Sequence, residues 1–75
     1  MTEQQWLERL AGALGVPAPT EEERESLLAL AGMAAHASER TAAPLSCWLA
    51  GRAGVAPDQA RQLAKQLTGE QGEAP

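Results

Sequence analysis

Apolar residues recur along the chain at the three- and four-residue spacing that places side chains on one face of a helix. In the N-terminal part, Trp6, Leu10 and Leu14 form such a stripe, and near the C-terminus Leu63 and Leu67 belong to another. The pattern predicts an all-α fold, a small bundle of four short helices. The predicted helices span about residues 2–14, 20–38, 44–53 and 57–68.

Capping and breaking residues set the predicted helix boundaries. Thr20 and Glu23 have the spacing of a capping box, in which the hydroxyl accepts the Glu23 amide and the carboxylate accepts the Thr20 amide. Gly15, Gly54 and Gly69 each follow an apolar stripe. We expect each of these glycines to end a helix, because glycine tolerates the left-handed conformation found there.

The second predicted helix is apolar on most of its circumference between Leu27 and Ala37. Since helices of this kind are buried on several sides, we expect it to lie at the centre of the bundle. A chain of 75 residues allows one small domain. We expect that domain to cover residues 1–69. Residues 70–75 offer no apolar anchor and are expected to be a disordered tail.

Composition strengthens the all-α prediction and narrows the function classes. The chain has sixteen alanines and ten leucines but no isoleucine, phenylalanine or tyrosine, which favours helices over sheets. The net charge is −4 and the six basic residues are spread out, which disfavours nucleic-acid and anionic-membrane binding. One cysteine, no secretory signal and no apolar run of membrane-spanning length indicate a cytoplasmic protein.

Two tryptophans are the only aromatic residues. Trp6 lies on a regular stripe and is expected to anchor the core. Trp48 follows a proline break on the shortest predicted helix and fits either the core or a partner-binding hot spot. The pattern places Leu45, Trp48, Leu49 and Arg52 on one side of this helix. Cys47 is interpreted as a small packing residue rather than a nucleophile.

His36 is the single histidine. Glu39 and Arg40 follow at three- and four-residue spacing, which would place all three side chains on one side of the last turn of the second helix. The functional interpretation is a polar contact site or general base, and the structural one is a favourable charge at a helix C-terminus. One histidine and one cysteine do not make a zinc site. The sequence therefore predicts no catalytic residue, no metal and no cofactor.

Five short segments, taken together, resemble a small actinobacterial helical domain of unknown function, DUF6457. The segments are Trp6-Leu7, Leu14-Gly15, His36-Ala37-Ser38-Glu39-Arg40, Ala42-Ala43-Pro44-Leu45 and Gly51-Arg52-Ala53-Gly54. The resembled domain occurs alone or fused behind a molybdenum cofactor guanylyltransferase domain. Its third helix is about one turn longer than the one expected here. The resemblance implies a place in molybdopterin guanine dinucleotide biosynthesis or in formate dehydrogenase maturation.

From this resemblance we expect a non-catalytic accessory or interaction domain that binds a larger protein, either the guanylyltransferase or a formate dehydrogenase-type enzyme. The expected contact residues are His36, Glu39, Arg40, Pro44 and Trp48. Two alternatives stay open. One is a small structural subunit of a molybdenum-dependent oxidoreductase, and the other is a module in which Arg40 or Arg52 holds a nucleotide or cofactor phosphate. A homodimer also stays open.

Overall fold

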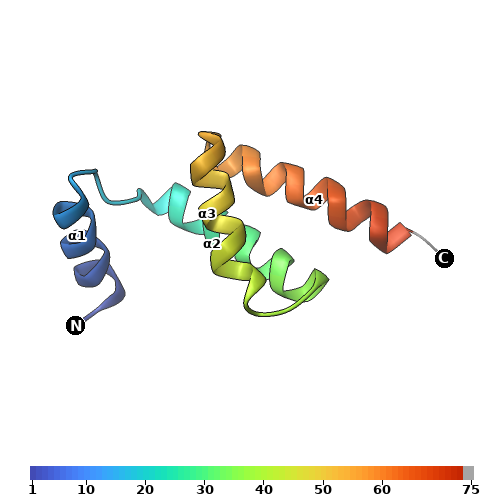
Figure 1. Cartoon of the computed structure of the whole chain (residues 1–75), viewed down its shortest axis with the longest axis horizontal. Coiled ribbons are helices and arrows are strands. Elements are labelled where there is room, and N and C mark those ends of the chain that lie inside the picture. Colours follow the sequence, from blue (N-terminus) through green and yellow to red (C-terminus); the bar gives the residue numbers. More distant parts are fainter. Residues whose placement is uncertain (74–75) are drawn as a thin grey trace.

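The structure is a computed structural model that describes the backbone of residues 1–73 and the side chains of residues 1–69. The four helices are α1 (Glu3–Leu14), α2 (Glu21–Ala37), α3 (Ala42–Ala53) and α4 (Pro57–Glu73), as Figure 1 shows. The described residues contain no strand, so the all-α prediction is confirmed. None of the helices within residues 1–73 is both long enough and apolar enough to cross a bilayer.

The first two helices each begin in a capping box. Thr20 Oγ1 accepts the Glu23 N–H at 3.1 Å, and Glu23 Oε1 accepts the Thr20 N–H at 2.9 Å, as the sequence predicts. Thr2 and Gln5 form the same reciprocal pair at the start of α1, at 3.1 and 3.0 Å. These bonds satisfy amides that have no partner inside the helix, and so they fix where α1 and α2 begin.

Glycine ends two helices and continues a third. Gly15 and Gly54 have φ values of 75° and 73° in the left-handed region, and they stop α1 and α3 as expected. Gly69 has no such conformation, and α4 continues through Glu73, so the prediction that this helix ends near residue 68 is wrong. Glycine inside a helix costs only about 0.5–1 kcal/mol relative to alanine, which does not by itself stop a helix.

The tail over residues 70–75 is expected to be disordered, but the backbone of residues 70–73 continues α4. Residues 74–75 and the side chains from residue 70 onward lie outside the described residues. Disorder therefore stays a prediction for residues 74–75 alone.

α3 begins at Ala42, two residues before the proline that was expected to open it. Pro44 is the third residue of α3, within the first turn, where a backbone N–H would have no partner inside the helix. The missing proline N–H therefore costs nothing at this position. The N–H groups of Ala42 and Ala43 donate to the carbonyls of Glu39 and Arg40 at 3.0 and 3.1 Å, which joins α3 to the connector before it.

α2 is the central helix, as predicted. Both α3 and α4 pack along α2, whereas α3 and α4 contact each other over only a short stretch (Figure 1). At one place Cys47 of α3 lies beside the Leu27 carbonyl of α2, and at another Thr68 of α4 lies beside Met33 of α2. The two outer helices are therefore held mainly by α2 rather than by each other.

α1 stands apart from the other helices, and within the described residues it packs against none of them (Figure 1). A six-residue connector joins it to α2, and the Arg24 guanidinium holds the Glu3 carboxylate with a shortest N–O distance of 2.8 Å. Trp6 is 53% exposed, so its prediction as a core anchor is wrong. Periodicity shows which side chains share a face, but not what that face meets.

The core is small. Among the side chains that the structure describes, only Ala11, Leu30 and Ala60 are buried. The accessible surface is 5817 Å², whereas a compact protein of this mass exposes about 4,400 Å². The radius of gyration is 13.5 Å, against about 11 Å for a compact domain of this length. Both quantities exceed the values for a compact domain, and the separation of α1 from the other helices contributes to the difference.

Candidate functional site

α3 and α4 turn their small residues inward and their large apolar residues outward. On α3 the partly buried side chains are all small: Ala42, Ala43, Ser46, Cys47 and Ala50. Its exposed side chains include the larger ones: Pro44, Leu45, Trp48, Leu49 and Arg52. α4 buries Ala60 and exposes Leu63 and Leu67. Large apolar groups gathered on a surface mark binding sites. The exposed side of α3 and α4 is therefore the candidate site.

Four residues form what we call the outer face of α3: Pro44, Leu45, Trp48 and Arg52. Leu45 and Trp48 are 63% and 61% exposed, and the four-residue steps from Pro44 to Trp48 to Arg52 put these side chains on one side of the helix. The expectation that Leu45, Trp48 and Arg52 share a side is confirmed. Leu49, which was expected on the same side, instead borders the space between α3 and α4. The structure also shows that this side faces solvent and not the core.

Arg52 lies over the Trp48 ring, with its guanidinium carbon 5.7 Å from the ring centroid. A cation at this distance is attracted to the negative face of the indole by about 0.5–1 kcal/mol at an exposed site. The sequence analysis named both residues but missed the pairing. Their four-residue spacing on one helix could have predicted the pairing, because side chains four residues apart are neighbours on a helix surface.

The three polar residues expected beside Trp48 do not share a helix face. His36 lies in the last turn of α2, as predicted, but α2 ends at Ala37. Ser38 has φ −143° and ψ −95°, so Glu39 and Arg40 continue in a non-helical connector. The helical spacing argument therefore fails for them. All three side chains are exposed, and their role as contact residues stays a prediction.

The two arginines suggested for phosphate binding lie at opposite ends of α3. Arg40 is in the connector before the helix and Arg52 is in its last turn. Ten residues from Ala42 to Arg52 correspond to about 15 Å along the helix axis. Each arginine would thus have to hold a phosphate alone. Within the described residues, no group of histidine, cysteine and carboxylate side chains has the arrangement of a metal site.

Cys47 lies on the inner side of α3. Its Sγ is 3.9 Å from the Leu27 carbonyl oxygen of α2, and partial burial raises the pKa of the thiol. Burial has this effect because it disfavours the charged thiolate. A neutral, partly buried thiol agrees with the interpretation of Cys47 as a packing residue.

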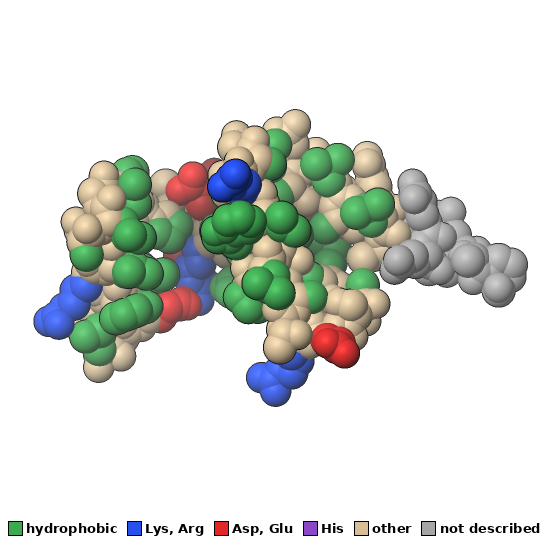
Figure 2. Space-filling model, in the orientation of Figure 1, with side chains coloured by type: hydrophobic (Ala, Val, Ile, Leu, Met, Phe, Trp, Pro, Cys, Tyr) green, Lys and Arg blue, Asp and Glu red, His purple; other side chains and the backbone are tan. Residues whose placement is uncertain are grey.

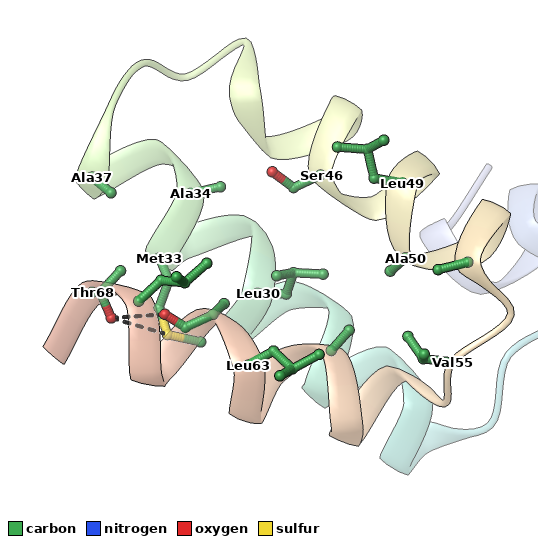
Figure 3. A pocket seen from close by; sticks show the side chains of 14 residues that line it. Leu30, Met33, Ala34, Ala37, Ser46, Leu49, Ala50, Val55, Leu63 and Thr68 are labelled. Carbon is green, nitrogen blue, oxygen red and sulfur yellow. Dashed lines mark hydrogen bonds between the residues drawn. The ribbon is translucent and has the colours of Figure 1, made fainter. Parts of the chain in front are cut away.

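An apolar groove of about 400 Å³ lies where α3 and α4 diverge over α2 (Figure 3). Its walls include Leu49 of α3 and Leu63 and Leu67 of α4, and Leu30 and Met33 of α2 form part of its floor. No charged side chain lines it. The sequence placed Leu63 and Leu67 on one stripe but gave no sign that this stripe borders a groove, because the divergence of α3 and α4 is a tertiary property.

The groove offers a ligand few polar groups. Ser46 and Thr68 supply the hydroxyl groups among its lining side chains. The Thr68 hydroxyl bonds within its own helix, 3.0 Å from the Ala64 carbonyl oxygen, and lies 4.0 Å from Met33 Sδ (Figure 3). The groove is therefore suited to apolar side chains rather than to a charged or strongly polar molecule.

Comparison with known proteins identifies a family without an assigned activity. Residues 1–73 match the family described as domain of unknown function DUF6457. No curated protein and no solved structure is detectably similar to the chain.

Proposed function

The chain belongs to the DUF6457 family of domains of unknown function, and from that premise we propose that it is a non-catalytic interaction domain of the molybdenum cofactor pathway. Its partner in this proposal is the molybdenum cofactor guanylyltransferase. The contact surface is the outer face of α3, with Trp48 as the apolar anchor and His36, Glu39 and Arg40 as polar contacts around the neighbouring connector.

The exposure of Trp48 is the observation that supports this function. Tryptophan and arginine are enriched among residues that dominate binding energies, and Trp48 and Arg52 lie together at 5.7 Å. Leu45 and Pro44 extend the apolar surface along the helix. Because Trp48 is 61% exposed, it contributes little to the core. In our proposal its role is to be buried against the partner protein.

The pathway comes from the sequence resemblance. The resembled domains occur alone or fused behind a guanylyltransferase domain, and a fusion of two domains in one chain favours contact between their separate counterparts. The same resemblance includes formate dehydrogenase maturation, which makes a formate dehydrogenase-type enzyme the second protein to test.

The test is isothermal titration calorimetry, in which the whole chain is titrated against the purified guanylyltransferase and, separately, against formate dehydrogenase. We expect binding to the guanylyltransferase. Trp48→Ala should weaken it at least about 30-fold, which corresponds to the 2 kcal/mol of a hot spot. Leu28→Ala is the matched control, because Leu28 is an apolar residue of α2 with 53% exposure and lies outside the outer face.

Two results would contradict the proposal. One is the absence of binding to the guanylyltransferase, and the other is equal binding by the Trp48→Ala and Leu28→Ala variants. Binding to formate dehydrogenase alone would overturn the choice of the guanylyltransferase and identify a formate dehydrogenase-type enzyme as the partner. Far-ultraviolet circular dichroism of each variant confirms that it is folded before the titration.

A fluorescence titration tests the rival function, phosphate binding at Arg40 or Arg52. The Trp6→Phe variant leaves Trp48 as the single tryptophan, and Trp48 reports on the Arg52 guanidinium above its ring. Our proposal expects no saturable change with a guanine nucleotide. A saturable change that Arg52→Gln abolishes would favour the phosphate-binding module instead.

A further inference from the structure

α1 carries an exposed apolar stripe, and the ion pair at its beginning shows which way the stripe is turned. Trp6, Leu10 and Leu14 are 53%, 40% and 67% exposed. Glu3, Leu10 and Leu14 follow one another at seven- and four-residue steps, so they lie on one face of α1. Because the Glu3 carboxylate is bound to the Arg24 guanidinium, this face is turned toward α2.

The same part of α2 lies beside the C-terminal half of α3. The short connector over residues 38–41 makes α2 and α3 an antiparallel pair. Cys47 Sγ lies 3.9 Å from the Leu27 carbonyl oxygen, so later residues of α3 lie beside earlier residues of α2. Arg24 is one turn before Leu27, on the same side of α2. The residue that holds α1 is therefore close to the helix that carries the outer face.

A gap separates α1 from α3. Figure 2 shows hydrophobic side chains on both sides of this gap, with basic and acidic side chains between them. Within the described residues α1 packs against no other helix, and the outer face of α3 is exposed. Two apolar surfaces on opposite sides of a gap leave water when the gap closes, and this burial favours closure.

The connector between α1 and α2 allows α1 to turn. The Val16 N–H donates to the Ala11 carbonyl at 3.0 Å, so Val16 belongs to the end of α1. Thr20 belongs to α2 through its capping box. Residues 17–19, between them, make no backbone hydrogen bond to the rest of the described chain. Rotation at these residues breaks no such bond, and a few connector residues suffice for a hinge.

We infer that α1 is a hinged cover for the outer face of α3. It closes with its apolar stripe against Leu45 and Trp48, and the structure describes its open position. The ion pair of Glu3 with Arg24 persists during closure, because both side chains are long and can change rotamer as α1 moves. In the closed position α1 competes with a partner for Trp48. This last consequence rests on the proposed function, whereas the closure itself does not.

Disulfide trapping in the whole chain tests the closure. In a Cys47→Ala background, a variant with Leu10→Cys and Leu45→Cys is oxidised, and internal disulfide formation is followed by mass spectrometry. The control pairs Leu10→Cys with Leu67→Cys, because Leu67 on α4 and Leu45 are both 63% exposed. We expect the first variant to react at least about 10-fold faster, because contact raises the effective concentration of the thiols. Equal rates, or a faster control, would overturn the closure.

The ion pair provides a second readout. Arg24→Gln in the variant with Leu10→Cys and Leu45→Cys should slow internal disulfide formation, because it frees the N-terminal end of α1. Arg61→Gln is the matched control, since Arg61 binds a carboxylate on its own helix and the side chains of Arg24 and Arg61 are 36% and 35% exposed. An equal rate in the two variants would overturn the part of the inference that assigns the ion pair to closure.

Acrylamide quenching tests whether the closed position covers Trp48. With Trp6→Phe added to the variant with Leu10→Cys and Leu45→Cys, Trp48 is the single tryptophan. Acrylamide should quench its fluorescence less in the oxidised chain than in the reduced chain. Equal quenching would overturn the claim that α1 covers Trp48.

Calorimetry with the guanylyltransferase then tests the competition. The oxidised chain should bind at least about 30-fold more weakly than the reduced chain, the loss expected when a hot spot is covered. Equal binding by the two forms would overturn the competition. An internal disulfide that covers Trp48, without binding by either form, would contradict the proposed function but not the closure. Binding that Trp48→Ala weakens, without preferential trapping, would overturn the closure alone.

Discussion

The guanidinium of Arg52 lies 5.7 Å above the ring of Trp48, one helical turn away on the exposed side of α3. The pairing holds two long side chains in one place before any partner arrives. Binding a partner then costs less conformational entropy than it would with two disordered side chains. The two residues together are a preformed apolar and cationic contact.

We predict that Trp6→Ala and Trp48→Ala both remain folded. Both side chains are more than half exposed. Surface substitutions usually change the free energy of unfolding by less than about 0.5 kcal/mol. For Trp48→Ala, loss of the contact with Arg52 adds about 0.5–1 kcal/mol. Leu30→Ala is the buried counterpart and should cost about 2–5 kcal/mol. Thermal melts followed by circular dichroism measure all three. A larger loss for Trp6→Ala than for Leu30→Ala would show that α1 packs in the core.

We predict that the attachment of α1 to α2 weakens in acid. The hydrogen bond and the charge of Arg24 lower the pKa of Glu3 below its usual value. A lowered folded-state pKa stabilises the attachment above the ordinary glutamate value of about 4.3, and this contribution is lost as the pH falls through the folded-state pKa. Carbon NMR of the Glu3 carboxyl should show a lower pKa in the unaltered chain than in Arg24→Gln. Equal values would mean that the ion pair is absent in solution.

We predict that Cys47 reacts slowly with a thiol reagent near neutral pH. Burial raises the pKa of the thiol, so the reactive thiolate is scarcer than for an exposed cysteine. Reaction with Ellman's reagent, followed by absorbance, should accelerate when the chain is unfolded in urea. A native rate as fast as the unfolded rate would contradict the packing of Cys47 against α2. The Cys47→Ala variant gives the blank.

We predict opposite effects for two alanine substitutions near the C-terminal end of α3, at Gly51 inside the helix and at Gly54 directly after it. Neither Gly51 nor Gly54 has an atom within 4 Å of an added Cβ, so space does not distinguish them. Gly51 is helical, and alanine should stabilise it by about 0.5–1 kcal/mol. Gly54 has φ 73°, where a side chain costs about 1–2 kcal/mol. Urea denaturation measures the difference, and equal effects would show that Gly54 does not need the left-handed conformation.

Local signals in the sequence were sufficient for the beginnings of α1 and α2. Thr20 and Glu23 carry their own hydrogen-bonding partners within one turn, so their geometry depends on no distant part of the chain. The same holds for Gly15 and Gly54, whose conformations were also predicted.

Burial and the groove were beyond these local signals. The stripe of Trp6, Leu10 and Leu14 has the period of a core helix, but its exposure depends on where the connector places α1. For the candidate site, the sequence put Trp48 and Arg52 on one side of a helix, as found. It could not anticipate that Glu39 and Arg40 leave the helical path, because that follows from the backbone at Ser38.

The small core has a thermodynamic consequence. Heat capacity and denaturant sensitivity of unfolding both grow with the surface that unfolding exposes, and this chain already exposes most of its large apolar side chains while Leu30 lies buried. A single copy should therefore unfold over a broad range of temperature and urea, with a shallow slope in each. A protein that covers the outer face of α3 would make both transitions steeper. The steepness of unfolding, measured separately from its midpoint, therefore reports whether the outer face of α3 is occupied.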